Sequence, residues 1–276
     1  THCIVTGDRF CYRFSKITGL FDSLKTGGKE LLSAPMQFNI WRAPTDNDRN
    51  IRREWEKAGF NVAQTRVAEI SAAMAGDTVT IQTQTVLAAV YRQWIVRIGA
   101  EITIDRQGGI ALRLAVTKNT EMPFLPRFGL RMFLRKDMDR AQYYGFGPQE
   151  SYEDKRCGAR LGLYQTTAME NHEDYIKPQE NGSHCRCDFV RVTDPADMGL
   201  CIQADTPFSM NLSPYTQEEL TEKQHNYELT ECGHTVLCID KGQSGIGTNS
   251  CGPELPEQYR FNDTDFVFSL RIDPVI

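Results

Sequence analysis

The sequence predicts an all-β protein built as a large antiparallel β-sandwich. Segments rich in β-branched residues alternate between apolar and polar side chains, as at 79–86 and 110–116. Turn signals containing Gly, Asp, Asn or Pro separate such segments, for example at 26–28, 76–77 and 105–109. Because patterns typical of helices are scarce, many short strands joined by tight turns are the architecture that these observations favour.

The other expected strands follow the same alternation in chain order. We expect them at 10–14, 94–104, 130–134, 187–192, 200–204, 236–239 and 266–272. One or two short helices are expected, at 50–58 and at 216–225, the latter with Thr216 as N-cap and Glu219 three residues on. No repeat period or low-complexity linker divides the 276 residues, so a single domain over 1–276 is predicted.

Composition and charge exclude several classes of protein. The chain has 40% hydrophobic and 24% charged residues, which is ordinary for a globular protein. It carries 31 basic and 36 acidic residues without a basic run, which argues against a nucleic-acid partner. No apolar run is long enough to span a membrane. Nine scattered cysteines, an odd number, favour reduced thiols and a cytoplasmic location.

The chain begins at Thr1, without an initiator Met, a basic segment or an apolar segment. We therefore expect a fragment or a processed chain with no signal peptide.

Two loops hold residues suited to sugar chemistry. The segment YYGFGPQESYED at 143–154 brings together Glu150, Glu153 and Asp154, and glycosidases use a pair of carboxyl groups. The alternative is a Gly-Pro turn followed by a solvated acidic rim. The glycine-rich segment GIGTNSCGP at 245–253 lacks the Lys-Ser/Thr pair of a phosphate loop, so we expect either a plain turn or backbone amides that approach a sugar hydroxyl.

Two further segments allow more than one interpretation. His184 and the cysteines at 185 and 187 suggest a metal site, but no second Cys/His pair lies nearby in the sequence. Two buried thiols on one face of a strand explain these cysteines better. In WRAPTDND at 41–48, Asp46 and Asp48 are suited to a cation or to sugar hydroxyls, or else to local turns, with Asp48 capping the following helix. No Gly-x-Ser-x-Gly elbow is present.

Five segments taken together resemble a known family. They are WRAPTDND at 41–48, GFGPQESY at 145–152, PQENG at 178–182, SPYT at 213–216 and GIG at 245–247. Their order is that of the C-terminal small-chain domain of β-galactosidases of glycoside hydrolase family 2, and the resemblance spans nearly the whole chain. It implies a β-supersandwich like that of galactose mutarotases.

The resemblance also implies a function shared with a partner. In the family, this domain packs against a (β/α)₈ barrel, on the same polypeptide or on a large subunit, that carries both catalytic glutamates of a retaining glycosidase. The alternating units of a barrel are missing here, so we expect no catalytic residue in this chain and no activity of the chain alone. The expected function is to supply cleft-edge loops and assembly surface to an enzyme that hydrolyses terminal β-D-galactosyl groups.

The resemblance places the substrate contacts in two loops. Asn249, Ser250 and Cys251 correspond to a loop that often carries a Trp stacked on the neighbouring sugar, with Cys251 at the Trp position. A thiol offers no aromatic face for such stacking. Asn47 and Asp48 lie in a second loop that borders the family's cleft. The family's magnesium and sodium ligands lie mainly outside this domain, so no cofactor or metal is expected here, although both ions are expected in the full enzyme.

A second hypothesis is a stand-alone carbohydrate-binding module or a galactose mutarotase. A mutarotase needs an acid and a base facing each other across a sugar ring. The candidates in this sequence are His172, His184 and Glu180.

Overall fold

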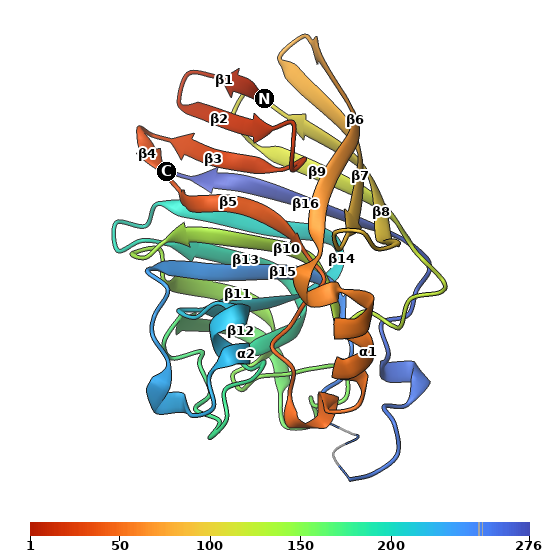
Figure 1. Ribbon diagram of the computed structural model, residues 1–276. Coiled ribbons are helices and arrows are strands. Elements are labelled where there is room, and N and C mark those ends of the chain that lie inside the picture. The colour runs from red at the N-terminus through yellow and green to blue at the C-terminus, as the bar shows by residue number, and fades with distance from the viewer. Residues whose placement is uncertain (248, 250) are drawn as a thin grey trace.

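The computed structural model describes residues 1–247, 249 and 251–276 and confirms an almost entirely β fold (Figure 1). Two α-helices and four short 3₁₀ turns interrupt the strands in this part of the chain. The strands are β1 (His2–Thr6), β2 (Phe10–Ser15), β3 (Phe21–Thr26), β4 (Lys29–Glu30), β5 (Leu32–Asn39), β6 (Gln64–Ala75), β7 (Thr78–Ala88), β8 (Trp94–Ile104), β9 (Ile110–Lys118), β10 (Arg127–Arg135), β11 (Arg140–Gly147), β12 (Arg160–Thr167), β13 (Ser183–Thr193), β14 (Gly199–Ser213), β15 (His234–Gln243) and β16 (Asp265–Val275).

The strands form one small sheet and one large, branched sheet, with antiparallel pairing throughout. The small sheet has the order β1-β2-β3-β4. The large sheet runs β12-β11-β13-β14-β16-β9-β8-β7-β6, and β15, β10 and β5 branch from it. The branch point is β14, whose first half pairs with β16 and whose second half pairs with β15. One long strand therefore joins two layers.

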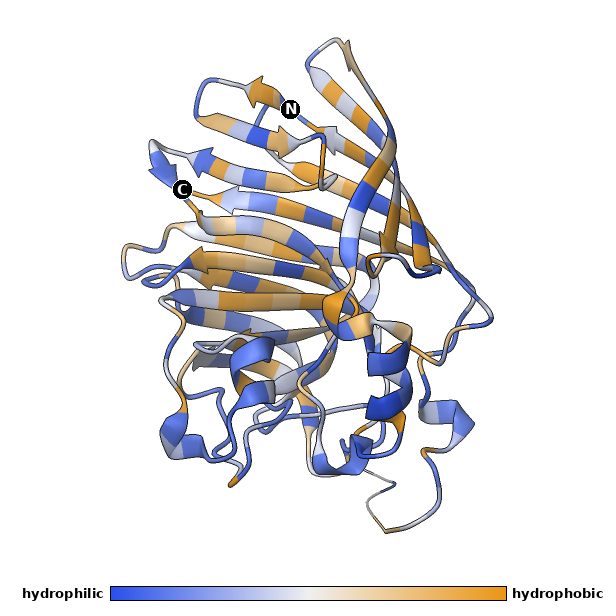
Figure 2. Cartoon of the chain, in the orientation of Figure 1, coloured by the Kyte–Doolittle hydropathy of each residue, from blue (hydrophilic) through white to orange (hydrophobic). Residues whose placement is uncertain are grey.

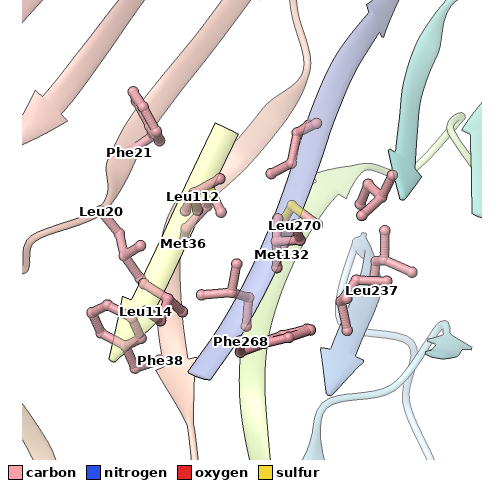
Figure 3. Close-up of a cluster of buried hydrophobic side chains, with 14 of the residues drawn as sticks. Leu20, Phe21, Met36, Phe38, Leu112, Leu114, Met132, Leu237, Phe268 and Leu270 are labelled. Carbon is pink, nitrogen blue, oxygen red and sulfur yellow. The ribbon is translucent and has the colours of Figure 1, made fainter. Parts of the chain in front are cut away.

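The core lies between these two layers. Figure 3 shows Leu112 and Leu114 of β9 with Phe268 and Leu270 of β16 on one side, facing Met36, Phe38, Met132 and Leu237 from β5, β10 and β15. Strand β9 alternates between buried and more exposed residues, as expected where only one face of a sheet meets the core. Figure 2 shows the same alternation as bands of opposite hydropathy along most strands.

The helices are short and cover one end of the molecule. Helix α1 (Ile51–Ala58) buries Trp55, and α2 (Gln217–Glu222) buries Gln217 and Leu220. Thr216 is the N-cap of α2, as predicted, and its hydroxyl accepts a hydrogen bond from the Glu219 amide at 3.1 Å. Asp48 does not cap α1, whose N-cap is Asn50; instead it closes the preceding 3₁₀ turn η1 (Asp46–Asp48).

Every strand that the sequence predicts is present, and the structure adds others. Strand β6 was missed because both of its faces are largely exposed, which removes the alternation of hydropathy. Strand β11 contains the first part of the 143–154 segment that was interpreted as a loop; the chain leaves the sheet only after Gly147. Among the described residues, no helix is long and apolar enough to cross a membrane.

Candidate functional site

Four of the five segments that carry the resemblance, 41–48, 145–152, 178–182 and 245–247, are joined by hydrogen bonds at one end of the sandwich, toward the bottom of Figure 1. The backbone amide of Asp46 donates to Gln179 Oε1 at 2.9 Å, and the Glu180 amide donates to the Ala43 carbonyl at 3.0 Å. These bonds join the 178–182 segment to the 41–48 segment. Residues far apart in the chain thus form one cluster of loops.

Arg42 is the centre of this cluster. Its buried guanidinium pairs with Asp48, with Nη2 to Oδ1 at 2.7 Å and Nε to Oδ2 at 3.1 Å. The same guanidinium donates to the carbonyls of Ser244 and Gly245. Asp48 also accepts the Thr45 amide at 2.9 Å. Asp48 thus fixes the guanidinium of Arg42, and Arg42 joins the 41–48 loop to the backbone at 244–245.

The turn at 245–247 is held from two more directions. Asn47 Nδ2 donates to the Ile246 carbonyl at 2.5 Å. The Asp154 carboxylate accepts the amides of Ile246 and Gly247 at 2.9 and 2.7 Å. Gly245 lies so close to Asp154 that a Cβ would stand 2.4 Å from its Cγ, so a side chain at 245 would displace the carboxylate. The amides of this turn are thus already occupied by a protein carboxylate.

A pocket of about 380 Å³ opens beside this turn. Asn47 and Asn249, both half-buried, contribute to its wall, together with the buried Asp48. Asn249 has a φ of 91°, a left-handed conformation that Asn adopts more readily than most residues. The complete lining is Asn47, Asp48, Asn50, Ile51, Glu54, Phe124, Gly245, Asn249, Glu254, Leu255 and Arg260.

The pocket also contains residues that the sequence did not single out. Phe124, half-buried, packs edge-on against Trp55 at 5.7 Å between ring centroids. The Arg260 guanidinium lies 5.4 Å from the centre of the Phe124 ring and donates to Glu254 at 3.0 Å. No local motif marks these residues, because Phe124 and Arg260 meet only through the fold. They give the pocket an aromatic ring and a cation.

Only some of the predicted substrate-contact residues line the pocket. Asn47, Asp48 and Asn249 share the pocket, which agrees with their placement in neighbouring loops. Cys251 is exposed and is absent from the described residues that line the pocket. Ser250 lies outside the described residues. The substrate-binding role of all five stays a prediction.

The three acidic residues of the 148–159 segment, Glu150, Glu153 and Asp154, are all engaged by other groups of the protein. Glu150 bonds to Lys155 and to the Tyr175 hydroxyl, and it accepts the Gly182 amide at 2.8 Å. Glu153 pairs with Arg156 at 2.9 Å. Asp154 is committed to the turn amides. The expectation that none of the three is a catalytic acid or nucleophile stays a prediction.

The residues considered for a mutarotase are buried and held by other side chains. Glu180 binds Arg127 at 3.1 Å, and Arg127 also pairs with Asp240. Burial raises the pKa of Glu180. His184 contacts Tyr143 and Asn171, and burial lowers its pKa to about 4. The side chain of His172 is 6% exposed and packs on Tyr215. The burial of Glu180 and His184 leaves neither with the solvent-accessible group that a sugar ring would require.

The His-Cys segment at 184–187 lies in β13 and is not a regular strand. Cys185 and Cys187 are both buried, as predicted. His184 is buried too, although a regular strand would place it with Arg186 on the face opposite the two cysteines. Arg186 has a φ of 58°, and the strand register shifts here, so the alternation is broken. Within the described residues, no group of three or more His, Cys, Asp or Glu could hold a metal ion.

Comparison with known proteins agrees with these features. The family described as "Beta galactosidase small chain" matches residues 6–272. A β-galactosidase of Actinobacillus pleuropneumoniae is 45% identical over 99% of this chain, and one of Staphylococcus xylosus is 34% identical over 98% of it. In each case the chain spans only 27% of the relative's length.

Solved structures show the same fold at very low sequence identity. A galactose 1-epimerase from Lactobacillus acidophilus NCFM has a TM-score of 0.52 at 7% identity, with 100% of this chain and 95% of that chain covered. A galactose mutarotase-like protein from Lactobacillus casei ATCC 334 has a TM-score of 0.50 at 10% identity, with 99% and 100% covered. The supersandwich predicted for this chain is therefore confirmed. The family match over nearly the whole chain and the converging loop segments together show that this chain belongs to the β-galactosidase small-chain family.

Proposed function

We propose that the chain is the C-terminal domain or small subunit of a β-galactosidase that hydrolyses terminal β-D-galactosyl groups. The observation that carries this proposal is the pocket of about 380 Å³, which two of the family's segments, 41–48 and 245–247, help to line. The pocket is lined by amide, carboxylate, guanidinium and aromatic groups, which is a mixture suited to a sugar. The β-galactosidase names of the relatives support this assignment.

Catalysis itself is assigned to a partner. The strand pairings of the described residues are all antiparallel, whereas a (β/α)₈ barrel needs parallel strands. The barrel, on the same polypeptide or on a large subunit, would supply the two carboxyl groups of a retaining mechanism. The relatives extend over almost four times the length matched by this chain, which leaves room for such a barrel. The isolated chain is then inactive.

The chain contributes the edge of the cleft. Asn47 and Asn249 are in position to bind sugar hydroxyls, and Phe124 supplies an aromatic ring in the same pocket. Asp48 does not bind the sugar in this proposal. Its ion pair with Arg42 fixes the backbone of the loop that carries Asn47. Any magnesium or sodium ion that the full enzyme binds would be held mainly by residues outside this chain. We also propose a cytoplasmic location. The eight cysteines from Cys3 to Cys238 form no disulfide, as is usual in that compartment.

The purified chain tests this proposal against the mutarotase alternative. We expect no hydrolysis of a chromogenic β-galactoside, and no acceleration of mutarotation when freshly dissolved α-D-galactose is followed by polarimetry. Hydrolysis by the chain alone would show that it contains its own catalytic groups. Accelerated mutarotation would instead assign it an epimerase function, contrary to the burial of His184 and Glu180.

A further inference from the structure

The Asp154 carboxylate, near the pocket, accepts hydrogen bonds from two backbone amides. Its two oxygens accept the amides of Ile246 and Gly247, one each. Asp154 comes from the segment between β11 and β12, some 90 residues earlier in the chain. A half-buried carboxylate at 2.7–2.9 Å from two successive amides forms charge-assisted hydrogen bonds, which are stronger than bonds between neutral groups.

The geometry leaves the turn little freedom. The absence of a side chain at Gly245 permits the close approach of Asp154. Asn47 holds the Ile246 carbonyl, and Arg42 holds the carbonyl of Gly245. Donors thus hold carbonyls of the turn while Asp154 holds its amides. Asn249, which belongs to the pocket wall, is only two residues after Gly247 in the sequence.

We propose that Asp154 is a positioning residue for galactoside binding: by holding the amides of Ile246 and Gly247, it orients the loop that carries Asn249 toward the sugar. This inference rests on the proposed function for the identity of the ligand. It assigns no proton transfer to Asp154. It also means that the amides at 246 and 247 are not themselves the groups that bind a sugar hydroxyl.

Hydrogen–deuterium exchange on the chain tests the contact without any assay of activity. In Asp154→Ala we expect the amides of Ile246 and Gly247 to exchange roughly tenfold or more faster, because each loses a bond to a charged group. Asp154→Asn keeps one acceptor oxygen and should give an intermediate effect. Glu153→Ala is the matched control, since Glu153 pairs with Arg156 and should leave both amides protected. Equal exchange in wild type and both Asp154 variants would overturn the proposal.

Steady-state kinetics of the chain assembled with its barrel partner test the positioning. Asp154→Ala should raise KM for a β-galactoside several-fold while kcat changes less, and Asp154→Asn should recover part of the loss. Glu153→Ala should match wild type. An unchanged KM in Asp154→Ala would overturn the positioning role even if exchange at 246 and 247 increases. Inactivity of the wild-type assembly would contradict the proposed function instead, and the exchange measurement would still decide whether Asp154 holds the turn.

Discussion

At the scale of single residues, buried charges hold the candidate site together. Arg42 is fully buried, and its guanidinium binds Asp48 and the carbonyls of Ser244 and Gly245, so two segments of the loop end depend on this one group. A second buried ion pair joins Arg127 of β10 to Asp240 of β15. Such pairs are costly to break, because removal of one partner leaves a charge without compensation in the interior.

Arg42→Ala should therefore be strongly destabilising. Removal of the guanidinium leaves the buried Asp48 carboxylate unpaired, and we expect the free energy of unfolding to fall by about 3–5 kcal/mol. Urea denaturation of the chain measures this loss. The control is Arg52→Ala, since Arg52 pairs with Glu56 on the surface of α1 and should change stability by less than about 0.5 kcal/mol. A loss no larger than that of the control would contradict the role given to Arg42.

His184 makes stability depend on pH. Its pKa falls from an ordinary 6.5 to about 4 on folding because burial disfavours the cation. As the pH decreases from 6.5 to 4, the unfolded chain takes up this proton before the folded chain does, so the stabilisation is complete above pH 6.5 and is lost toward pH 4.

The corresponding measurement compares urea denaturation of wild type and His184→Gln at pH 7 and pH 4.5. Wild type should lose up to about 3 kcal/mol more than the variant, following the conversion of pKa shift into free energy. Parallel losses in the two proteins would show that another group controls the acid response.

Prediction from sequence at this scale succeeds only where a motif exists. Asn47 and Asn249 were expected in neighbouring cleft loops, and they share one pocket. Phe124, Asp154 and Arg260 were not assigned to it. Their partners lie far away in the chain, as with Phe124 and Arg260, so no spacing of residues reveals the contact before the chain is folded.

At the scale of elements, α1 supports one wall of the pocket. The indole nitrogen of Trp55 donates to the Phe124 carbonyl at 2.8 Å, which ties the helix to the 119–126 loop. The helix ends at Gly59, whose φ of 83° is left-handed and whose amide closes the last turn. The helix was predicted from its charge pattern and boundaries, but its packing partner was not, because that contact is tertiary.

Gly59→Ala should loosen this element. The new Cβ would be strained at a positive φ and would stand 2.5 Å from the Cβ of Ala89. Gly76→Ala is a matched control, because Gly76 also has a positive φ of 57° but nothing lies within 4 Å of the added carbon. The control should cost about 1–2 kcal/mol from backbone strain alone, and Gly59→Ala roughly 1–3 kcal/mol more from overpacking. Thermal denaturation gives both values; equal losses would contradict the packing of Gly59 against Ala89.

At the scale of the whole molecule, the two layers share one hydrophobic core that draws on strands from both ends of the chain. The single domain expected over 1–276 stays a prediction, which unfolding experiments can test. Urea unfolding should then be one transition, with coincident curves from far-UV circular dichroism and from the fluorescence of the three tryptophans. Two separated transitions would show that the layers fold independently.

The class of fold was predictable because alternation and turn residues are local signals, whereas the branching at β14 was not. Nothing in the sequence of β14 indicates that its two halves pair with different strands. That division is decided by packing between the layers. The same limit applies to function: the chain spans only 27% of the length of the relatives, so the proposed catalytic barrel is to be sought outside it.

The central claim is that this domain completes the active site of a barrel. The most direct test is reconstitution, in which hydrolysis of a chromogenic β-galactoside is measured for the chain, for the barrel-containing remainder of the enzyme, and for the two expressed together. We predict turnover only when both are present, reduced by Asn47→Ala in this chain and unaffected by Glu153→Ala. Full turnover by the barrel-containing part alone would contradict the claim.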